Sequence, residues 1–390
     1  MTLILDALFS SVALGHFAVD LLNGQRAIIF TYLSSQLGLS NTLLGFFSTV
    51  YVVAGAAFQP VFGFAADRIG VRWVVVGGML WMAVFYSLAL ITPGQTAFWL
   101  LALATLGSAA FHPAGVKQAT LRGRTFYAGR ETTSAAYFFF FGQAGYFLGP
   151  VVAGPILDRF GMLGLIWMVG IVGMVGLNAS RQLGLVVDFR TPIPSPLEKA
   201  ASIALRNGWR KKALPLFAFA LVAAFQAWSQ QNITTFMPKY LSDLGQSASV
   251  YGLIVAIFVG GSAIGGALGG ILADRFGKRS VAVASLALAS IPLFLVSALG
   301  WSPWYYLLIP LAGGLTGAVH SILVVLAQRA IPGGMAMASG LILGFMFTSG
   351  ALGTLLCGYL ADKWGFPPVF MLTAGIALVA SLLALTLRKN

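Results

Sequence analysis

A histidine and an aspartate four residues apart are the most chemically informative pair in this chain of 390 residues. Asp20 lies near the middle of an apolar run, residues 7–33, where a charged side chain costs about 2.5–3.5 kcal/mol to place in a bilayer. His16 precedes it by one helical turn, so the two side chains share a face. A carboxylate in a half-dry site and an imidazole that titrates near neutrality can together take up and release a proton. The alternative is a buried structural hydrogen bond between them.

Two further residues extend this polar group. His112 precedes Pro113, which frees a backbone carbonyl one turn earlier, so the histidine serves either proton coupling or structure. Arg26 lies about 9 Å beyond Asp20 along the helix and about 120° around it, and it shares a face with Asn23 rather than pairing with Asp20. It either binds an anionic group of a substrate or extends to the outer headgroups.

Other polar side chains are expected to line a substrate cavity at the midplane of the membrane. They lie among aromatic residues, which suits a small amphipathic ligand, although such rings equally pack against lipid. Besides Arg26 and Asn23, the residues assigned to this cavity are Tyr137, Gln143, Gln226, Trp228, Gln230 and His320.

The composition requires a membrane. Hydrophobic residues make up 58% of the chain and charged residues only 8%, where a soluble domain carries about 25% charged residues. The net charge of +13 comes from basic residues at the ends of apolar runs, which argues against a nucleic-acid partner. With one cysteine, three scattered histidines and no His-Glu-x-x-His string, the sequence predicts no disulfide, metal centre, cofactor or enzymatic activity.

Apolar runs of about 20 residues, each long enough to cross a bilayer, recur along the whole chain. Twelve are predicted, the first serving also as the insertion signal rather than as a cleaved peptide. With both termini cytoplasmic, the outer loops carry only Arg159, Lys239 and Lys363, as the positive-inside rule requires of a protein of the inner (plasma) membrane. The runs are 7–33, 42–66, 73–92, 96–120, 132–157, 160–181, 213–237, 248–273, 280–299, 303–329, 337–361 and 367–387.

The longest polar stretch divides these runs into two groups of six. We expect an N-terminal six-helix bundle over 1–182, a cytoplasmic linker over 183–212 and a C-terminal six-helix bundle over 213–390. Within the linker, residues 197–209 form either a short amphipathic helix on the inner leaflet or a solvated segment.

One pattern, Gly-x-x-x-Asp-Arg/Lys-x-Gly, occurs four times, with its aspartate at positions 67, 158, 274 and 362, so that the two copies are 91 residues apart in the first half and 88 in the second. Each copy closes the second helix of a three-helix unit, so successive copies alternate between the two sides of the membrane. This predicts two parallel halves, each an inverted three-helix repeat. The first glycine allows close helix packing, and the aspartate can accept hydrogen bonds from the N-terminus of a neighbouring helix.

The first and third copies, on the cytoplasmic side, are expected to act in gating. Asp67 and Asp274 would brace that side through helix termini of the opposite half when the cavity opens outward. The alternative is a topological turn without a gating role. The gating residues are Gly63, Asp67, Arg68, Gly70, Arg72, Gly270, Asp274, Arg275, Gly277 and Arg279, with Gly149 and Pro150 of the fifth helix.

The first copy, extended to Arg72, resembles the signature of the major facilitator superfamily, and other segments resemble the fosmidomycin resistance protein family. The resemblance implies a secondary transporter that exports a small drug-like molecule in exchange for protons. The fourth helix departs from many drug exporters of the superfamily because it lacks their membrane-embedded arginine. The segments are Ala13–Asp20, Gln59-Pro60, Gly107–Pro113, Gly142–Gly145, Leu148–Pro150, Ala327-Gln328, Ile331–Gly333 and Ser339–Leu341.

In the fifth helix, Gly145-x-x-x-Gly149-Pro150 resembles an antiporter motif of the superfamily, although the equivalent eleventh helix has Thr354 in place of the proline. The sequence thus favours a monomeric proton-coupled antiporter with a small-molecule substrate. The alternatives are a proton- or ion-coupled importer of an organic anion, and a lipid or lysolipid flippase, which the polar seventh helix disfavours. A receptor would need an output domain.

Overall fold

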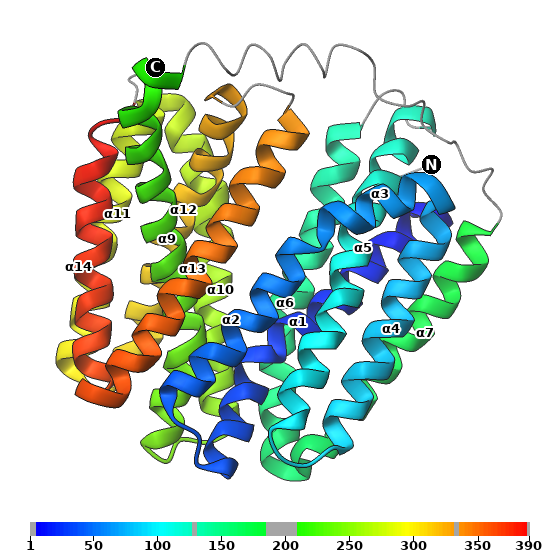
Figure 1. Cartoon of the computed structure of the whole chain (residues 1–390), viewed down its shortest axis with the longest axis horizontal. Coiled ribbons are helices and arrows are strands. Elements are labelled where there is room, and N and C mark those ends of the chain that lie inside the picture. The colour runs from blue at the N-terminus through cyan, green and yellow to red at the C-terminus, as the bar shows by residue number, and fades with distance from the viewer. Residues whose placement is uncertain (1–4, 127–130, 185–208, 331–334, 388–390) are drawn as a thin grey trace. The chain divides into compact units, whose positions relative to one another are not determined.

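The computed structural model describes residues 5–126, 131–184, 209–330 and 335–387, a part of the chain that is helical and contains no β-strand (Figure 1). The predicted linker over 183–212, with its segment 197–209, lies largely outside these residues. The helices are α1 (Ala7–Leu37), α2 (Asn41–Ala57), α3 (Gln59–Ile69), α4 (Val71–Ile91), α5 (Thr96–Phe126), α6 (Glu131–Gly164), α7 (Ile166–Leu183), α9 (Trp209–Asp243), α10 (Ala248–Phe276), α11 (Lys278–Leu299), α12 (Tyr305–Ala330), α13 (Met335–Trp364) and α14 (Phe366–Ala384).

These helices fall in the twelve predicted ranges, with α2 and α3 together forming one span from Asn41 to Ile69. Ten spans are long and apolar enough to cross a membrane by length and composition. The helices outside this count, α7 and α9, are more polar. The end of α7 includes Asn178, Ser180 and Arg181, and a run of amides and hydroxyls interrupts the middle of α9.

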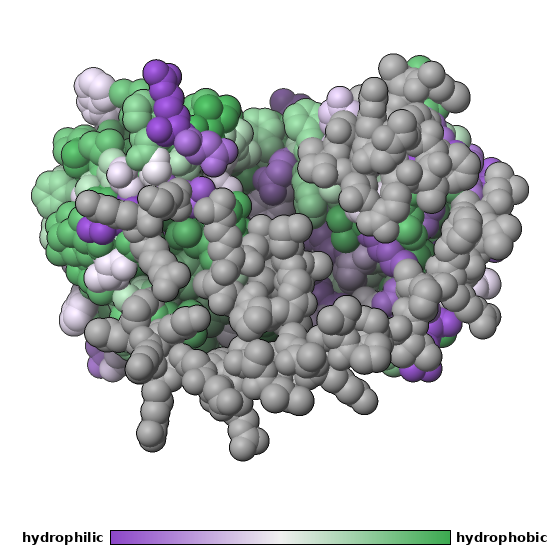
Figure 2. All heavy atoms as spheres, turned by 90° about the horizontal axis from the view of Figure 1, so that it is seen from above, coloured by the Kyte–Doolittle hydropathy of each residue, from purple (hydrophilic) through white to green (hydrophobic). Residues whose placement is uncertain are grey.

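The surface of the described helices is largely apolar, as expected of a surface that contacts lipid. On α7, Trp167, Met174 and Leu177 are exposed and recur at helical spacing. Figure 2 shows hydrophobic residues over much of the visible surface, with hydrophilic residues gathered in patches.

The chain forms two compact units, and each is built from both halves of the sequence. The first contains Met1–Leu39, Val50–Thr191 and Leu241–Ala256, and the second contains Ser40–Thr49, Pro192–Tyr240 and Ile257–Asn390. The helices α2 and α10 therefore each contribute to both units.

In the first unit, α1 is the central helix, packing most extensively against α6 and also against α5 and α7. Its buried residues lie on all sides, as expected of a helix enclosed by others. Glycines allow the close approach of α6: a Cβ atom at Gly145 would overlap the carbonyl oxygen of Phe17, and one at Gly149 would overlap that of Leu21. The motif that resembles an antiporter pattern thus brings two backbones into contact beside Asp20.

In the second unit, α11 packs against α12 and α14, and α9 contacts several helices through its polar side chains. Asn232 donates a hydrogen bond to Thr373 of α14, and Gln226 donates one to the carbonyl oxygen of Thr316 in α12. These two residues of α9 thus each donate a hydrogen bond to another helix of the unit.

The four copies of the repeated pattern end their helices in the same way. The last glycine of each copy, at positions 70, 161, 277 and 365, has a positive φ between 60° and 100°. This conformation is easily reached only by glycine, which explains the residue at this position.

The second and fourth copies contact a helix N-terminus, as the pattern predicts. Asp158 accepts hydrogen bonds from the backbone amides of Ala248 and Ser249, 2.7 and 2.8 Å long, at the start of α10. In the same manner Asp362 accepts bonds of 2.7 and 2.8 Å from the amides of Asn41 and Thr42, at the start of α2. Each aspartate satisfies two amides that have no partner within their own helix.

The first and third copies make different contacts. Asp67 forms an ion pair with Lys117, with Oδ1 and Nζ 2.6 Å apart, and Asp274 lies 3.7 Å from Lys278. Within the described residues, neither aspartate accepts hydrogen bonds from the backbone amides at the start of a helix. The same sequence motif therefore makes two kinds of contact in one molecule.

The cap on α2 can be tested by substitution. Asp362→Ala should remove about 1 kcal/mol of stabilisation from the start of α2, which corresponds to roughly fivefold faster hydrogen exchange of the amides near Thr42. Asp274→Ala, at the equivalent but uncapped position, is the matched control and should leave exchange at the start of α11 within about twofold. Equal effects of the two substitutions would show that the hydrogen bonds of Asp362 do not stabilise α2.

Candidate functional site

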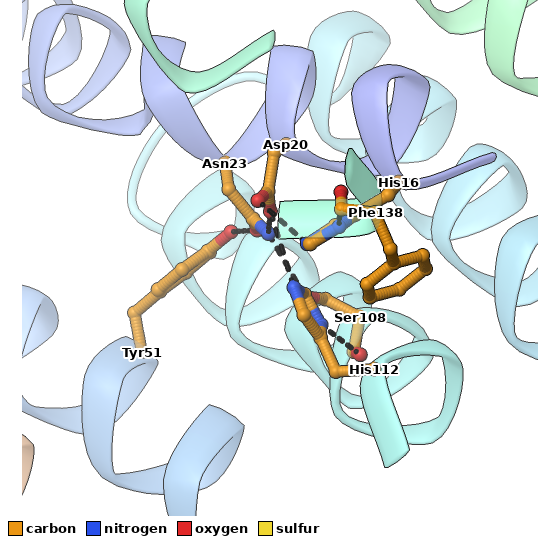
Figure 3. Close-up of polar contacts among 7 residues, drawn as sticks. All are labelled: His16, Asp20, Asn23, Tyr51, Ser108, His112 and Phe138. Carbon is orange, nitrogen blue, oxygen red and sulfur yellow. Dashed lines mark hydrogen bonds and ion pairs between the residues drawn. The ribbon is translucent and has the colours of Figure 1, made fainter. Parts of the chain in front are cut away.

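The polar site of the first unit centres on the carboxylate of Asp20, which lies between two imidazoles (Figure 3). His16 Nε2 lies 3.2 Å from Oδ2, and His112 Nε2 lies 3.3 Å from Oδ1. His16 is buried, whereas Asp20 and His112 are half-buried. The structure thus brings together the three residues that the sequence assigned to proton coupling, two from α1 and one from α5.

The second nitrogen of each imidazole identifies where its hydrogen lies. Nδ1 of His16 is 2.7 Å from the carbonyl oxygen of Phe138, and Nδ1 of His112 is 2.7 Å from that of Ser108. Because a carbonyl oxygen only accepts, each Nδ1 carries a hydrogen and donates it. In a neutral ring, Nε2 would then present a lone pair to Asp20.

This arrangement has a consequence for the number of protons. A lone pair facing an ionised carboxylate is unfavourable, so each of the two contacts is favourable only when a proton lies on Nε2 or on the facing oxygen. When both imidazoles are neutral and the carboxylate is ionised, the triad of His16, Asp20 and His112 can therefore take up two further protons. Loss of either proton leaves a buried polar contact unsatisfied.

The position of His16 depends on a glycine in α6. Its ring stacks on Phe138 with centroids 4.0 Å apart and meets the edge of His112 at 4.9 Å. A Cβ atom at Gly142 would overlap the imidazole ring. Gly142 therefore gives His16 the space to lie between α6 and Asp20.

A second set of hydrogen bonds, through Asn23, holds the same carboxylate. Asn23 donates from Nδ2 to Asp20 Oδ1 and to Ser108 Oγ, both over 2.8 Å. Its carbonyl oxygen accepts a 2.8 Å hydrogen bond from the hydroxyl of Tyr51 in α2. Asn23, which we expected to bind substrate, thus has both amide hydrogens and its oxygen engaged by the protein.

Arg26 is buried inside the first unit, with 4% of its surface exposed. Its guanidinium lies over the ring of Tyr51, 5.3 Å from the centroid, and Nη1 has no hydrogen-bond partner. No described aspartate or glutamate forms an ion pair with it. This burial does not fit the interpretation of an arginine that extends to the headgroups.

The triad also has the residue types of a metal site, since one ligand atom from each member lies within 4.8 Å of the others. However, the imidazoles contact different oxygens of the carboxylate, which therefore lies between them. Direct contacts of this kind favour shared protons over a single central ion.

The remaining residues assigned to substrate binding are divided between the units. In the first, Tyr137 and Gln143 of α6 are exposed at the surface of the described helices. In the second, Trp228 donates to the sulfur of Cys357 and Gln230 donates to Ser262, while Gln226 is buried and His320 is half-buried.

The gating residues of the first and third copies form local contacts. The guanidinium groups of Arg68, Arg72 and Arg275 lie over neighbouring aromatic rings, at 4.9, 5.3 and 5.2 Å from the centroids. Arg279 lines a groove beside the start of α11. In the first unit, the carbonyl of Pro150 lies close to Gly252 of α10.

Sequence reasoning missed three contributors to the site. Ser108 lies one turn before His112 on the same helix face, and this spacing could have identified it. Tyr51 and Phe138 come from helices far apart in the sequence and carry no local signal.

The family model of the Major Facilitator Superfamily matches residues 12–245 and again residues 219–390. The chain belongs to this superfamily of transporters, which confirms the predicted fold class and places it among transporters rather than enzymes. It is an integral membrane protein.

Among curated proteins, the chain is 25% identical to the fosmidomycin resistance protein of Escherichia coli, over 96% of this chain and 91% of that protein. It is 27% identical to the uncharacterized MFS-type transporter YfnC of Bacillus subtilis, over 93% and 88%. The multidrug resistance protein MdtG of Citrobacter koseri is 33% identical over 39% of each chain.

Solved structures share the fold. The nucleoside transporter NupG superposes with a TM-score of 0.73 at 16% identity, over 96% of this chain and 97% of that one. The peptide transporter POT in complex with sulfate superposes with a TM-score of 0.74 at 17% identity, over 97% and 93%.

The role of Gly142 leads to a prediction about the site. Gly142→Ala should displace the His16 ring and destabilise the protein by about 1–3 kcal/mol, as overpacking does. Gly77→Ala in α4 is the matched control, because nothing lies within 4 Å of its added methyl group and alanine favours helix by up to about 1 kcal/mol. Thermal unfolding in detergent should show a lower Tm for the first variant only. Unchanged stability in both would contradict the tight packing of His16.

Proposed function

We propose that this transporter is a proton-coupled antiporter that exports small drug-like molecules, with His16, Asp20 and His112 as its proton-binding group. The observation that carries the proposal is the buried carboxylate between two imidazoles, each held by a backbone carbonyl at its other nitrogen. Charge in the core of a membrane helix is retained mainly for function, and this group offers sites for two protons.

The names of the relatives support export. One is a fosmidomycin resistance protein and another is a multidrug resistance protein, which indicates efflux of small molecules. The glycine contacts of α6 with α1, in the segment that resembles an antiporter motif, are consistent with this direction. The basic residues of the expected cytoplasmic loops support an inner-membrane protein with both termini inside.

Transport by alternating access is supported by the two states of the repeated pattern. Asp158 and Asp362 cap helices, whereas Asp67 and Asp274 do not. We propose that the two pairs exchange roles during the cycle, so that the cytoplasmic pair is engaged when the cavity opens outward.

One observation favours a second candidate, the import of an organic anion with protons. Arg26 is a buried cation without an acidic partner among the described residues, and Asp20 lies about 9 Å away along the same helix. When protons neutralise Asp20, the surplus positive charge of the site favours an anion. Protonation would then promote substrate binding, which is the sign required for symport.

Loss of the carboxylate tests the proton site. In proteoliposomes with an imposed pH gradient, Asp20→Asn should reduce gradient-driven transport of a responsive compound at least about tenfold, within the usual range of coupling energies. Binding and exchange of that compound should persist, because the amide keeps the shape of the side chain. Fosmidomycin is a suitable first compound in the panel.

Asp243→Asn is the control for this experiment, since it removes an exposed carboxylate at the end of α9. Its transport should equal that of the wild type. Full gradient-driven transport by Asp20→Asn would contradict the assignment of the proton site.

The sign of the pH dependence separates the two candidate functions. If protons and substrate compete, affinity should fall as the pH decreases, as antiport requires. For a symported anion, affinity should rise at low pH and should fall at least about tenfold in Arg26→Gln, as expected for loss of a charge-assisted contact.

Equilibrium binding measured across pH in wild type, Arg26→Gln and Arg26→Lys makes this distinction. Retained affinity in Arg26→Lys with loss in Arg26→Gln would identify a requirement for positive charge. An unchanged affinity in Arg26→Gln would exclude the anion-binding role of this residue.

A further inference from the structure

The hydrogen bonds of Asn23 connect the proton site to a different helix. Asn23 Nδ2 donates to Asp20 Oδ1, and Asn23 Oδ1 accepts from the hydroxyl of Tyr51, both over 2.8 Å. Figure 3 shows Asn23 between Asp20 and the tyrosine. A change in the charge of the carboxylate therefore acts on a side chain that also holds α2.

We propose that Asn23 and Tyr51 are positioning residues that transmit the protonation state of the triad of His16, Asp20 and His112 to α2. This inference rests on the proposed proton site. In this role neither residue binds a proton.

The first step of the transmission follows from hydrogen-bond strength. An ionised Oδ1 accepts the Asn23 hydrogen in a charge-assisted bond, which is stronger than the bond to a protonated carboxyl group. Because His112 contacts the same oxygen, a proton placed there competes directly with Asn23. A proton in this contact, whether on Oδ1 or on Nε2 of His112, therefore weakens the hydrogen bond from Asn23 and loosens its side chain.

The second step follows from the burial of Tyr51. Its side chain is 5% exposed, so a hydroxyl that loses the acceptor on Asn23 becomes a buried unsatisfied group. The Arg26 guanidinium lies over the Tyr51 ring and restrains the ring itself. The alternative partner beside it is the Thr105 side chain of α5, and a shift of the Tyr51 hydroxyl toward Thr105 would move a ring whose backbone belongs to α2.

The position of α2 gives this movement a consequence. Its residues up to Thr49 belong to the second compact unit and its residues from Val50 belong to the first. Within the second unit, Thr49 donates to the carbonyl oxygen of Ala351, 2.7 Å away, and Asp362 caps the start of the helix. The helix that senses the proton site is thus also attached to α13.

The charged and titratable groups around Asp20 are few in the described residues. The first half of α2 contributes none, and the single charged residue of α7 is Arg181 in its last turn. Facing the Asp20–Tyr51 link are His16 and Arg26 of α1, His112 of α5, Tyr86 of α4 and Tyr146 of α6.

The test measures hydrogen exchange of the α2 amides over residues 50–57, corrected for intrinsic chemical rates, at about pH 6 and about pH 8, on either side of the usual histidine titration. No substrate is needed. In the wild type, protection should differ about tenfold between the two conditions, the effect of gaining or losing one hydrogen bond.

Tyr51→Phe keeps the ring beneath Arg26 and removes only the hydroxyl. It should reduce the pH-dependent difference to less than about twofold. The matched control is Tyr86→Phe, which removes another buried hydroxyl of the first unit, one that donates to the carbonyl oxygen of Leu22. That variant should keep the wild-type difference, which separates transmission from a general loss of stability.

Asp20→Asn distinguishes failure of this inference from failure of the proton site. It should abolish the pH-dependent difference. If it does so while Tyr51→Phe behaves as wild type, the proton site stands and the role of Tyr51 is wrong. If Asp20→Asn retains the difference, Asp20 is not the proton site that α2 responds to. If the wild type itself shows no difference between the two pH values, the proposed transmission to α2 is wrong.

Discussion

Every buried polar group in a membrane helix needs a partner from the protein, and in this molecule that requirement falls most heavily on the carboxylate of Asp20. Its two oxygens are contacted by both imidazoles and by Asn23. Those neighbours are in turn held by backbone carbonyls, by Ser108 and by Tyr51. Because water does not readily replace a lost partner inside the bundle, the gain or loss of one proton changes which hydrogen bonds the whole network can form.

Close packing of the α1 and α6 backbones surrounds this network and makes it possible. Glycines of α6 allow α1 to approach so closely that Gly142 faces the His16 ring and Gly145 faces the carbonyl of Phe17. With lipid on the outside, hydrophobic exclusion does not drive these helices together, so close backbone contact is the main stabilising term available. The same contacts that stabilise the first unit also fix the geometry of its proton site.

Local patterns in the sequence predicted much of the fold and part of the site. The spacing of His16 and Asp20 predicted their contact, and the repeated pattern predicted the capping by Asp158 and Asp362, but not the positive φ of its last glycine. These features depend on one helix turn or one helix end. Length and apolar character alone mark ten spans, because α7 and α9 carry polar residues that contacts within the protein must satisfy.

What the sequence did not predict depends on contacts between helices. Helix rotation and register, which have no local signature, set three of these contacts. They are the approach of His112 to Asp20, the hydrogen bond from Tyr51 to Asn23 and the space that Gly142 leaves for His16. Asn23 illustrates the difference: a polar residue beside Asp20 looked available to substrate, but packing engages all of its amide. The placement of Arg26 against Tyr51, rather than toward the headgroups, has the same origin.

The presence of only three histidines makes the central claim directly measurable. Nuclear magnetic resonance of protein labelled with ¹⁵N at histidine reports the hydrogen on each ring nitrogen as the pH changes, with His320 as the internal reference. We predict that His16 and His112 keep the Nδ1 hydrogen throughout, lose the Nε2 hydrogen in a coupled titration, and lose that coupling in Asp20→Asn. Two neutral rings with the hydrogen on Nε2, or titrations unaffected by Asp20→Asn, would contradict the account.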